Sequence, residues 1–172
     1  MNNKKNEKLI TLEVNTDNVF SLEYVKNYLR IDNEYDDEFL QEAIKTAITF
    51  AEKMINKDIS NKKIQYSFTQ TLNTKQIAVE NKEIDDIETL LIDGIEKQKD
   101  TDFTIKNGKI EFNENISGNI LMVFTTNITT IESDIKQAIL FHIASIYQNK
   151  SGLCKVPDAS IEIYNMNKQI RF

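Results

Sequence analysis

Cys154 is the one cysteine in the chain, and a cysteine thiolate is a nucleophile. The neighbouring Lys155 would favour the thiolate, but a nucleophilic cysteine also needs a base. The one histidine, His142, falls within the apolar stretch 138–147, where we expect it to be buried. A lone cysteine also forms no internal disulfide. We therefore predict neither a catalytic cysteine nor a disulfide framework.

Metal binding would need His, Cys or carboxylate ligands at suitable spacing. His142 has no such partner nearby in sequence, which favours a core histidine over a ligand or base. The acidic residues between 32 and 37 invite comparison with a calcium loop, but Asp37 stands where the loop needs Gly and Ala43 where it needs Glu. The sequence predicts helix-capping carboxylates there and no metal site.

Acid–base and nucleotide chemistry have equally little support. Pairs such as Asp85/Asp86 and Glu111/Glu114 are common in a chain with 27 acidic residues, so they do not mark a catalytic pair. The four glycines form no phosphate-cradling pattern. A net charge of -6 argues against non-specific duplex binding, which needs clustered Lys and Arg. We predict no cofactor and no enzymatic activity.

The clearest structural element is a helix over residues 36–55. Its apolar residues recur every three or four positions and form one face, which we expect to be a principal part of the core. Acidic residues at its start would cap free N–H groups and complement the helix dipole. The face consists of Phe39, Leu40, Ala43, Ile44, Ala47, Ile48, Ala51, Met54 and Ile55.

Two further helices are predicted. A short one follows Ser21, an N-cap residue, and runs to about Arg30. The other spans about 131–149, and its apolar surface is broad enough to be buried on more than one side. Pro157 argues against continued helix directly after it, so residues 151–172 are expected to form an extended tail.

Residues 62–127 have the period of strands. Ile64, Tyr66 and Phe68 alternate with polar residues, and Asn107-Gly108 between two apolar runs is a strong hairpin signal. A last strand is expected over residues 119–125, separate from the run at 109–112. Residues 1–18 read as a flexible N-terminal arm, in which residues 9–14 form either a short strand or a segment laid on a neighbour.

The expected fold class is α+β: a helical bundle of one short and two long helices, with an inserted antiparallel β unit and an extended C-terminal tail. A chain of 172 residues is long enough for one domain, so we expect a single domain over 1–172. The longest apolar run is too short to cross a bilayer, which predicts no membrane segment. Within the domain we expect an arm (1–18), a helical body (19–58 and 131–150), a β insert (62–127) and a docking tail (151–172).

Short motifs follow one another along these elements. They are VKNYLRID at 25–32, DDEFL at 36–40, IETLLIDG at 87–94, IKQAIL at 135–140, IYQNK at 146–150, VPDA at 156–159, and Arg171 near the end. In this order they resemble the head-tail connector (adaptor or head-completion) proteins of long-tailed double-stranded DNA phages. The resemblance covers roughly residues 20–172.

The resemblance implies a structural protein of the virion neck, present in the bacterial host cytoplasm during assembly. It implies a homo-oligomeric ring of roughly a dozen copies below the portal protein, which joins capsid to tail, contacts tail or stopper proteins, and lets DNA pass without specific binding. The implied portal or subunit interface comprises Tyr147, Val156, Pro157, Ile161, Ile163, Tyr164, Ile170, Arg171 and Phe172.

Two other classes of protein stay open at this stage. One is another non-enzymatic phage interaction module, such as a tail-completion protein or a small regulatory binder, in which the β insert contacts the partner. The other is an enzyme that uses Cys154 or His142, for which the sequence offers least support.

Overall fold

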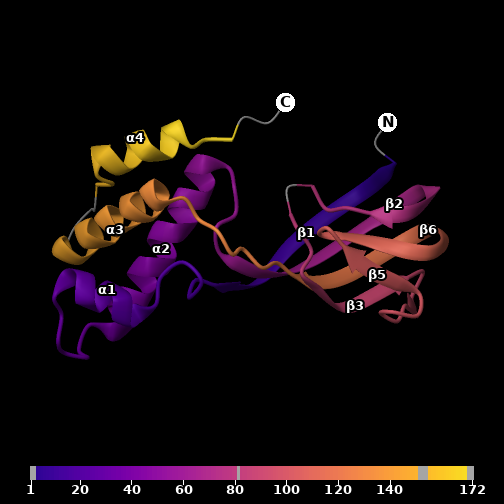
Figure 1. Ribbon diagram of the computed structural model, residues 1–172, viewed down its shortest axis with the longest axis horizontal. Coiled ribbons are helices and arrows are strands. Elements are labelled where there is room, and N and C mark those ends of the chain that lie inside the picture. The colour runs from indigo at the N-terminus through magenta and orange to yellow at the C-terminus, as the bar shows by residue number, and fades with distance from the viewer. Residues whose placement is uncertain (1–2, 81, 151–154, 170–172) are drawn as a thin grey trace. The chain divides into compact units, whose positions relative to one another are not determined.

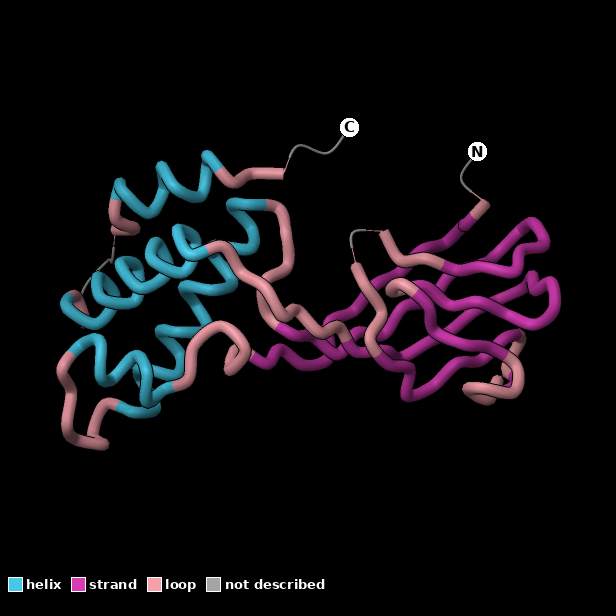
Figure 2. Tube along the Cα trace, in the orientation of Figure 1, coloured by secondary structure: helices cyan, strands magenta, loops and turns pink. Residues whose placement is uncertain are grey.

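The computed structural model describes residues 3–80, 82–150 and 155–169 (Figure 1). The chain divides into two compact units, one of strands and one of helices (Figure 2). The β unit comprises Met1–Val14 and Asn61–Asn127, and the helical unit comprises Asn15–Ser60 and Ile128–Phe172. The predicted α+β class is confirmed. The single domain expected over 1–172 stays a prediction, because compactness does not measure whether the two units unfold together.

In its described part the helical unit contains four helices: α1 (Leu22–Leu29), α2 (Asp37–Ile55), α3 (Ser133–Gln148) and α4 (Asp158–Met166). Helix α2 packs against the other three, which explains why its apolar face is so regular. The structure buries Leu40, Ala43, Ile44, Ala47, Ile48, Ala51 and Ile55, as the spacing predicts, and leaves Phe39 and Met54 half-buried.

Local signals explain where the first helix begins and ends. The Ser21 hydroxyl accepts a hydrogen bond from the Tyr24 N–H at 3.2 Å, which confirms the predicted N-cap of α1. Arg30 adopts a left-handed conformation after the last turn, and its N–H donates to the Asn27 carbonyl.

The C-terminal segment is not the extended tail expected from the sequence. Pro157 stands at the N-cap of α4 with φ −56°, a value that suits the start of a helix. Ser160 and Tyr164, one turn apart, are both fully buried. The expected bundle of one short and two long helices therefore gains α4 as a fourth member.

The β unit holds one antiparallel sheet, in which the described strands follow the order β1-β2-β6-β3-β4 and β5 pairs with β6. The strands are β1 (Lys4–Asn15), β2 (Asn61–Ile77), β3 (Asp86–Ile92), β4 (Ile95–Glu96), β5 (Phe103–Lys106) and β6 (Lys109–Thr125).

The core of the β unit follows from the period-2 alternation and the register. On β6, Met122 lies between Tyr66 on β2 and Leu90 on β3, and all three are buried. The predicted hairpin is confirmed, because β5 and β6 pair on either side of Asn107 and Gly108, which have φ of 52° and 69°.

Residues 4–15 form a strand in place of the flexible arm expected over 1–18. Strand β1 hydrogen-bonds to β2, which offsets the cost of ordering it. The Lys4 ammonium lies 4.8 Å from the centre of the Phe68 ring, and Tyr66 donates to the Glu7 carboxylate. Burial raises the pKa of Tyr66 and lowers that of Lys4. These contacts fix the first half of β1 on the sheet.

Candidate assembly interface

The interface expected from the sequence falls at the end of α3 and along α4. Val156 and Ile163 are half-buried against the core of the helical unit, and Pro157 and Ile161 are also half-buried. Tyr164 is fully buried inside the helical unit, so its side chain is not on the surface in this conformation. The expected residues Ile170, Arg171 and Phe172 lie outside the described residues.

Tyr147 belongs to a polar cluster that joins the end of α3 to the start of α2. Its hydroxyl donates to the Asp36 carboxylate at 2.8 Å, and the Lys150 ammonium pairs with the same carboxylate at 2.7 Å. The ammonium also lies 4.0 Å from the centre of the Tyr147 ring and 5.6 Å from that of Phe39. We call these four residues the Asp36 cluster.

Asp36 was predicted to cap the start of α2, and this prediction is wrong. The Asp36 side chain makes no capping hydrogen bond to α2. Instead, the hydrogen bonds from Lys150 and Tyr147 lower the pKa of the Asp36 carboxyl. The sequence held one signal of this pairing, the Tyr and Lys of the IYQNK motif at the end of α3, but nothing local says which acid they meet.

Helix α4 is fastened to the helical unit along its length. The buried Ser160 hydroxyl donates to the Ala138 carbonyl at 2.8 Å, and Asn167 donates to the Asp134 carboxylate at 2.8 Å. Beyond the helix, the Gln169 N–H donates to the Ile55 carbonyl at 2.8 Å. The segment that carries the expected interface therefore reaches residue 169 in a fixed position on α2 and α3.

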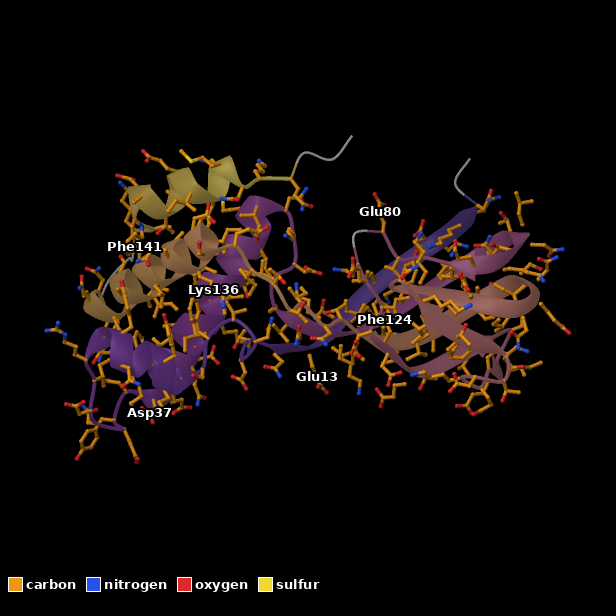
Figure 3. All side chains as sticks on the ribbon, in the orientation of Figure 1. Glu13, Asp37, Glu80, Phe124, Lys136 and Phe141 are labelled. Carbon is orange, nitrogen blue, oxygen red and sulfur yellow. The ribbon has the colours of Figure 1, made fainter. Side chains whose placement is uncertain are left out.

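Several exposed apolar residues were not singled out by the sequence pattern as surface positions. Met166 at the end of α4 is 82% exposed. Phe141 on α3 is also partly exposed (Figure 3). In the β unit, Leu9, Ile10, Leu12 and Val14 on β1 and Ile95 on β4 are exposed. Burial cannot be read from hydropathy alone, and these positions show where apolar surface is available to a partner.

His142 is buried, as predicted. Its side chain lies edge-on to the Phe50 ring at 5.2 Å between centres, and its Nδ1 has no hydrogen-bond partner among the described residues. Burial lowers the pKa of His142, so the folded chain holds it neutral.

We expect acid to destabilise the helical unit through His142. The unfolded chain takes up a proton as the pH falls below about 6.5 and the folded chain resists it, so this stability is present above that pH and lost below it. Between pH 7.5 and 5.5 the loss is up to about 1.4 kcal/mol. Urea melts at the two pH values should show this loss of stability in the wild type and not in His142→Leu. Equal pH dependence in both proteins would contradict a neutral, buried His142.

Within the described residues, no group of three or more His, Cys, Asp or Glu side chains is placed to hold a metal ion. The same part of the chain has no helix with the length and hydropathy that spanning a membrane requires. Cys154 lies outside the described residues.

Chains from gene transfer agent (GTA) particles have a similar fold. A chain in the neck of an empty GTA particle, computed with C6 symmetry, is 13% identical with a TM-score of 0.63, over 96% of this chain and 97% of that one. A chain in the neck of a native GTA particle, computed with C12 symmetry, is 14% identical with a TM-score of 0.63 and the same coverage. A chain of the native GTA virion is 13% identical with a TM-score of 0.60, over 95% and 96%.

The family follows from the sequence match. A protein-family model described as "Head completion protein" matches residues 18–151, which include α1, α2, strands β2 to β6 and α3. The chain therefore belongs to the head completion protein family. No curated protein is detectably similar to it.

Proposed function

We propose that this chain is a structural protein of a phage or phage-like virion neck, where copies form a ring below the portal, join the capsid to the tail and continue the DNA channel. The observation that carries the proposal is the head completion match over residues 18–151. The fold supports it, because chains of the same fold lie in particle necks computed with C6 and C12 symmetry. A closed ring of roughly a dozen copies would fit such cyclic symmetry.

The charge of the chain suits a channel through which DNA moves. A net charge of -6 gives little attraction for phosphates, so DNA would pass without specific binding. The proposal needs no catalysis and no cofactor. Its partners are other copies of the chain, the portal protein, and tail or stopper proteins, and it would assemble in the cytoplasm of the bacterial host.

The docking role falls on the last residues of the chain. Gln169 is fixed to the carbonyl of Ile55 at the end of α2, so the residues that follow start from a defined point on the helical unit. These residues are Ile170, Arg171 and Phe172, an apolar and cationic ending suited to a pocket on a portal or on a neighbouring subunit.

A stop codon at position 170 tests this role. We expect the shortened chain to melt like the wild type, because Ser160 and Tyr164 keep their buried positions. In the particle that encodes the chain, we expect DNA-filled heads and at least a tenfold drop in tailed particles, counted by electron microscopy. The matched control is Lys168→Ala, an exposed change just before the cut, which should assemble normally. Normal yields from the shortened chain would contradict the docking role.

A further inference from the structure

Strand β1 lies at one edge of the sheet, with β2 as its one strand partner in the described chain. An edge strand presents unpaired backbone N–H and C=O groups that another strand can use. From Lys5 to Asn15 every residue of β1 is classed as exposed, so side chains on both faces of the strand remain accessible. Figure 3 shows Glu13 of this strand extending away from the ribbon.

The two halves of β1 differ in how they are protected. The first half carries Lys4, Lys5 and Lys8, and Asn6 has φ 54°; charges and irregular backbone of this kind discourage strand pairing. Residues 9–14 read LITLEV, with one charge and no Pro or Gly. Their exposed apolar side chains are Leu9 (42%), Ile10 (37%), Leu12 (46%) and Val14 (36%). An exposed segment of this composition is a strong candidate for pairing.

The opposite edge of the sheet is also incomplete. Strand β4 has two residues and pairs with only Leu91 and Ile92 of the seven-residue β3. Just beyond β4, the Lys97 N–H also donates to the Leu90 carbonyl at 2.8 Å, so on this side residues 86–89 of β3 have no described strand partner. Ile95 on β4 is 65% exposed. We call β4 and residues 86–89 of β3 the acceptor edge.

The two edges carry opposite net charges. Strand β1 holds three Lys and two Glu, whereas residues 85–99, which include the acceptor edge, hold five acidic residues and two Lys. A cyclic assembly needs two different surfaces on each subunit that fit each other, and two unlike edges of one sheet meet that requirement. A backbone ladder between them would add main-chain hydrogen bonds to the contact between apolar side chains.

We propose that residues 9–14 of β1 pair with the acceptor edge of a second copy of this chain, so that the sheets of successive subunits join around a ring. The inference rests on the proposed function, which supplies the cyclic assembly. It adds the element that links the subunits, and this element belongs to the β unit.

Light scattering on the full chain over a concentration series tests the proposal with two edge variants. Leu12→Lys blocks β1, and Ile95→Lys blocks the acceptor edge; both positions are exposed, so the fold should survive, as circular dichroism can verify. We expect the wild type to self-associate and each variant to associate at least tenfold more weakly. Tyr35→Lys changes an exposed aromatic residue of the helical unit and should associate like the wild type.

An equal mixture of Leu12→Lys and Ile95→Lys gives the most specific test of the pairing. Each variant keeps one intact edge, so the mixture should form dimers of about twice 19.9 kDa and nothing larger. A wild type that stays monomeric, an edge variant that assembles like the wild type, or a mixture that stays monomeric would each overturn the pairing. None of these results removes the chain from the neck, which particle imaging tests separately.

Discussion

Replacing Ile48 by alanine lowers the free energy of unfolding of the helical unit by about 2–5 kcal/mol. Ile48 is completely buried in the middle of α2, the helix that packs against α1, α3 and α4. Truncating it removes three carbon atoms from the centre of this core and leaves a cavity that the neighbouring helices cannot close without moving. Urea melts followed by circular dichroism at the helix band measure the change.

The control is Met166→Ala in the same helical unit. Met166 is also a large apolar residue but is 82% exposed at the end of α4, so its truncation should change the free energy of unfolding by less than about 0.5 kcal/mol. Equal effects for the two substitutions would mean that the buried face of α2 is assigned wrongly.

Replacing Tyr164 by alanine should cost about 3–5 kcal/mol and release α4 from the helical unit. The Tyr164 ring is completely buried and lies 6.2 Å from the Phe50 ring of α2, so it is the main apolar anchor of α4. Urea melts report the loss of stability, and limited proteolysis after residue 155 reports the release. Melting and digestion like those of the wild type would show that α4 is held by other contacts.

Tyr164→Phe separates the ring from the hydroxyl. The hydroxyl has no hydrogen-bond partner among the described residues, and burial raises its pKa. Removing a buried polar group without a partner does not cost stability, so this variant should be as stable as the wild type or more stable. A clear loss of stability would reveal a hydrogen bond to the Tyr164 hydroxyl.

The sequence predicts best those elements whose cause is local. The stripe on α2, the Ser21 cap and the Asn107-Gly108 turn each depend on residues within a few positions, and the structure has all three. Strand β6 shows the limit of such reasoning. Its apolar ends predict two separate strands, yet residues 109–125 form one strand, because β2 pairs along most of its length and imposes the extended conformation between them.

The elements that were missed depend on contacts far apart in the chain. Pro157 and the short segment after it do not predict a helix until α2 and α3 offer a surface on which Tyr164 is buried. Likewise, Asp36 pairs with Tyr147 and Lys150, more than a hundred positions away. The sequence pattern places Asp36 at the start of a helix. Only the packing of α2 beside α3 determines which side chains contact the Asp36 carboxylate.

The candidate interface was predicted as one set of residues and divides in the structure. Tyr164 packs in the core of the helical unit, and Tyr147 donates a hydrogen bond to Asp36. Truncating either residue would destabilise the subunit itself, whatever its effect on a partner. Variants in the exposed half of β1 leave the buried core intact, so they can test assembly without first destabilising the subunit. Residues 9–14 were also predicted as either a strand or a segment laid on a neighbour, and in the proposed ring they are both.

We infer that the chain forms part of the neck of a virion. Cryo-electron microscopy of the particle that encodes it, reconstructed with cyclic symmetry at the junction of head and tail, tests this claim most directly. We expect density that fits the helical unit and the β unit in a closed ring between the portal and the tail, surrounding the DNA channel. A neck fully accounted for by other proteins, with this chain absent from it, would contradict the account.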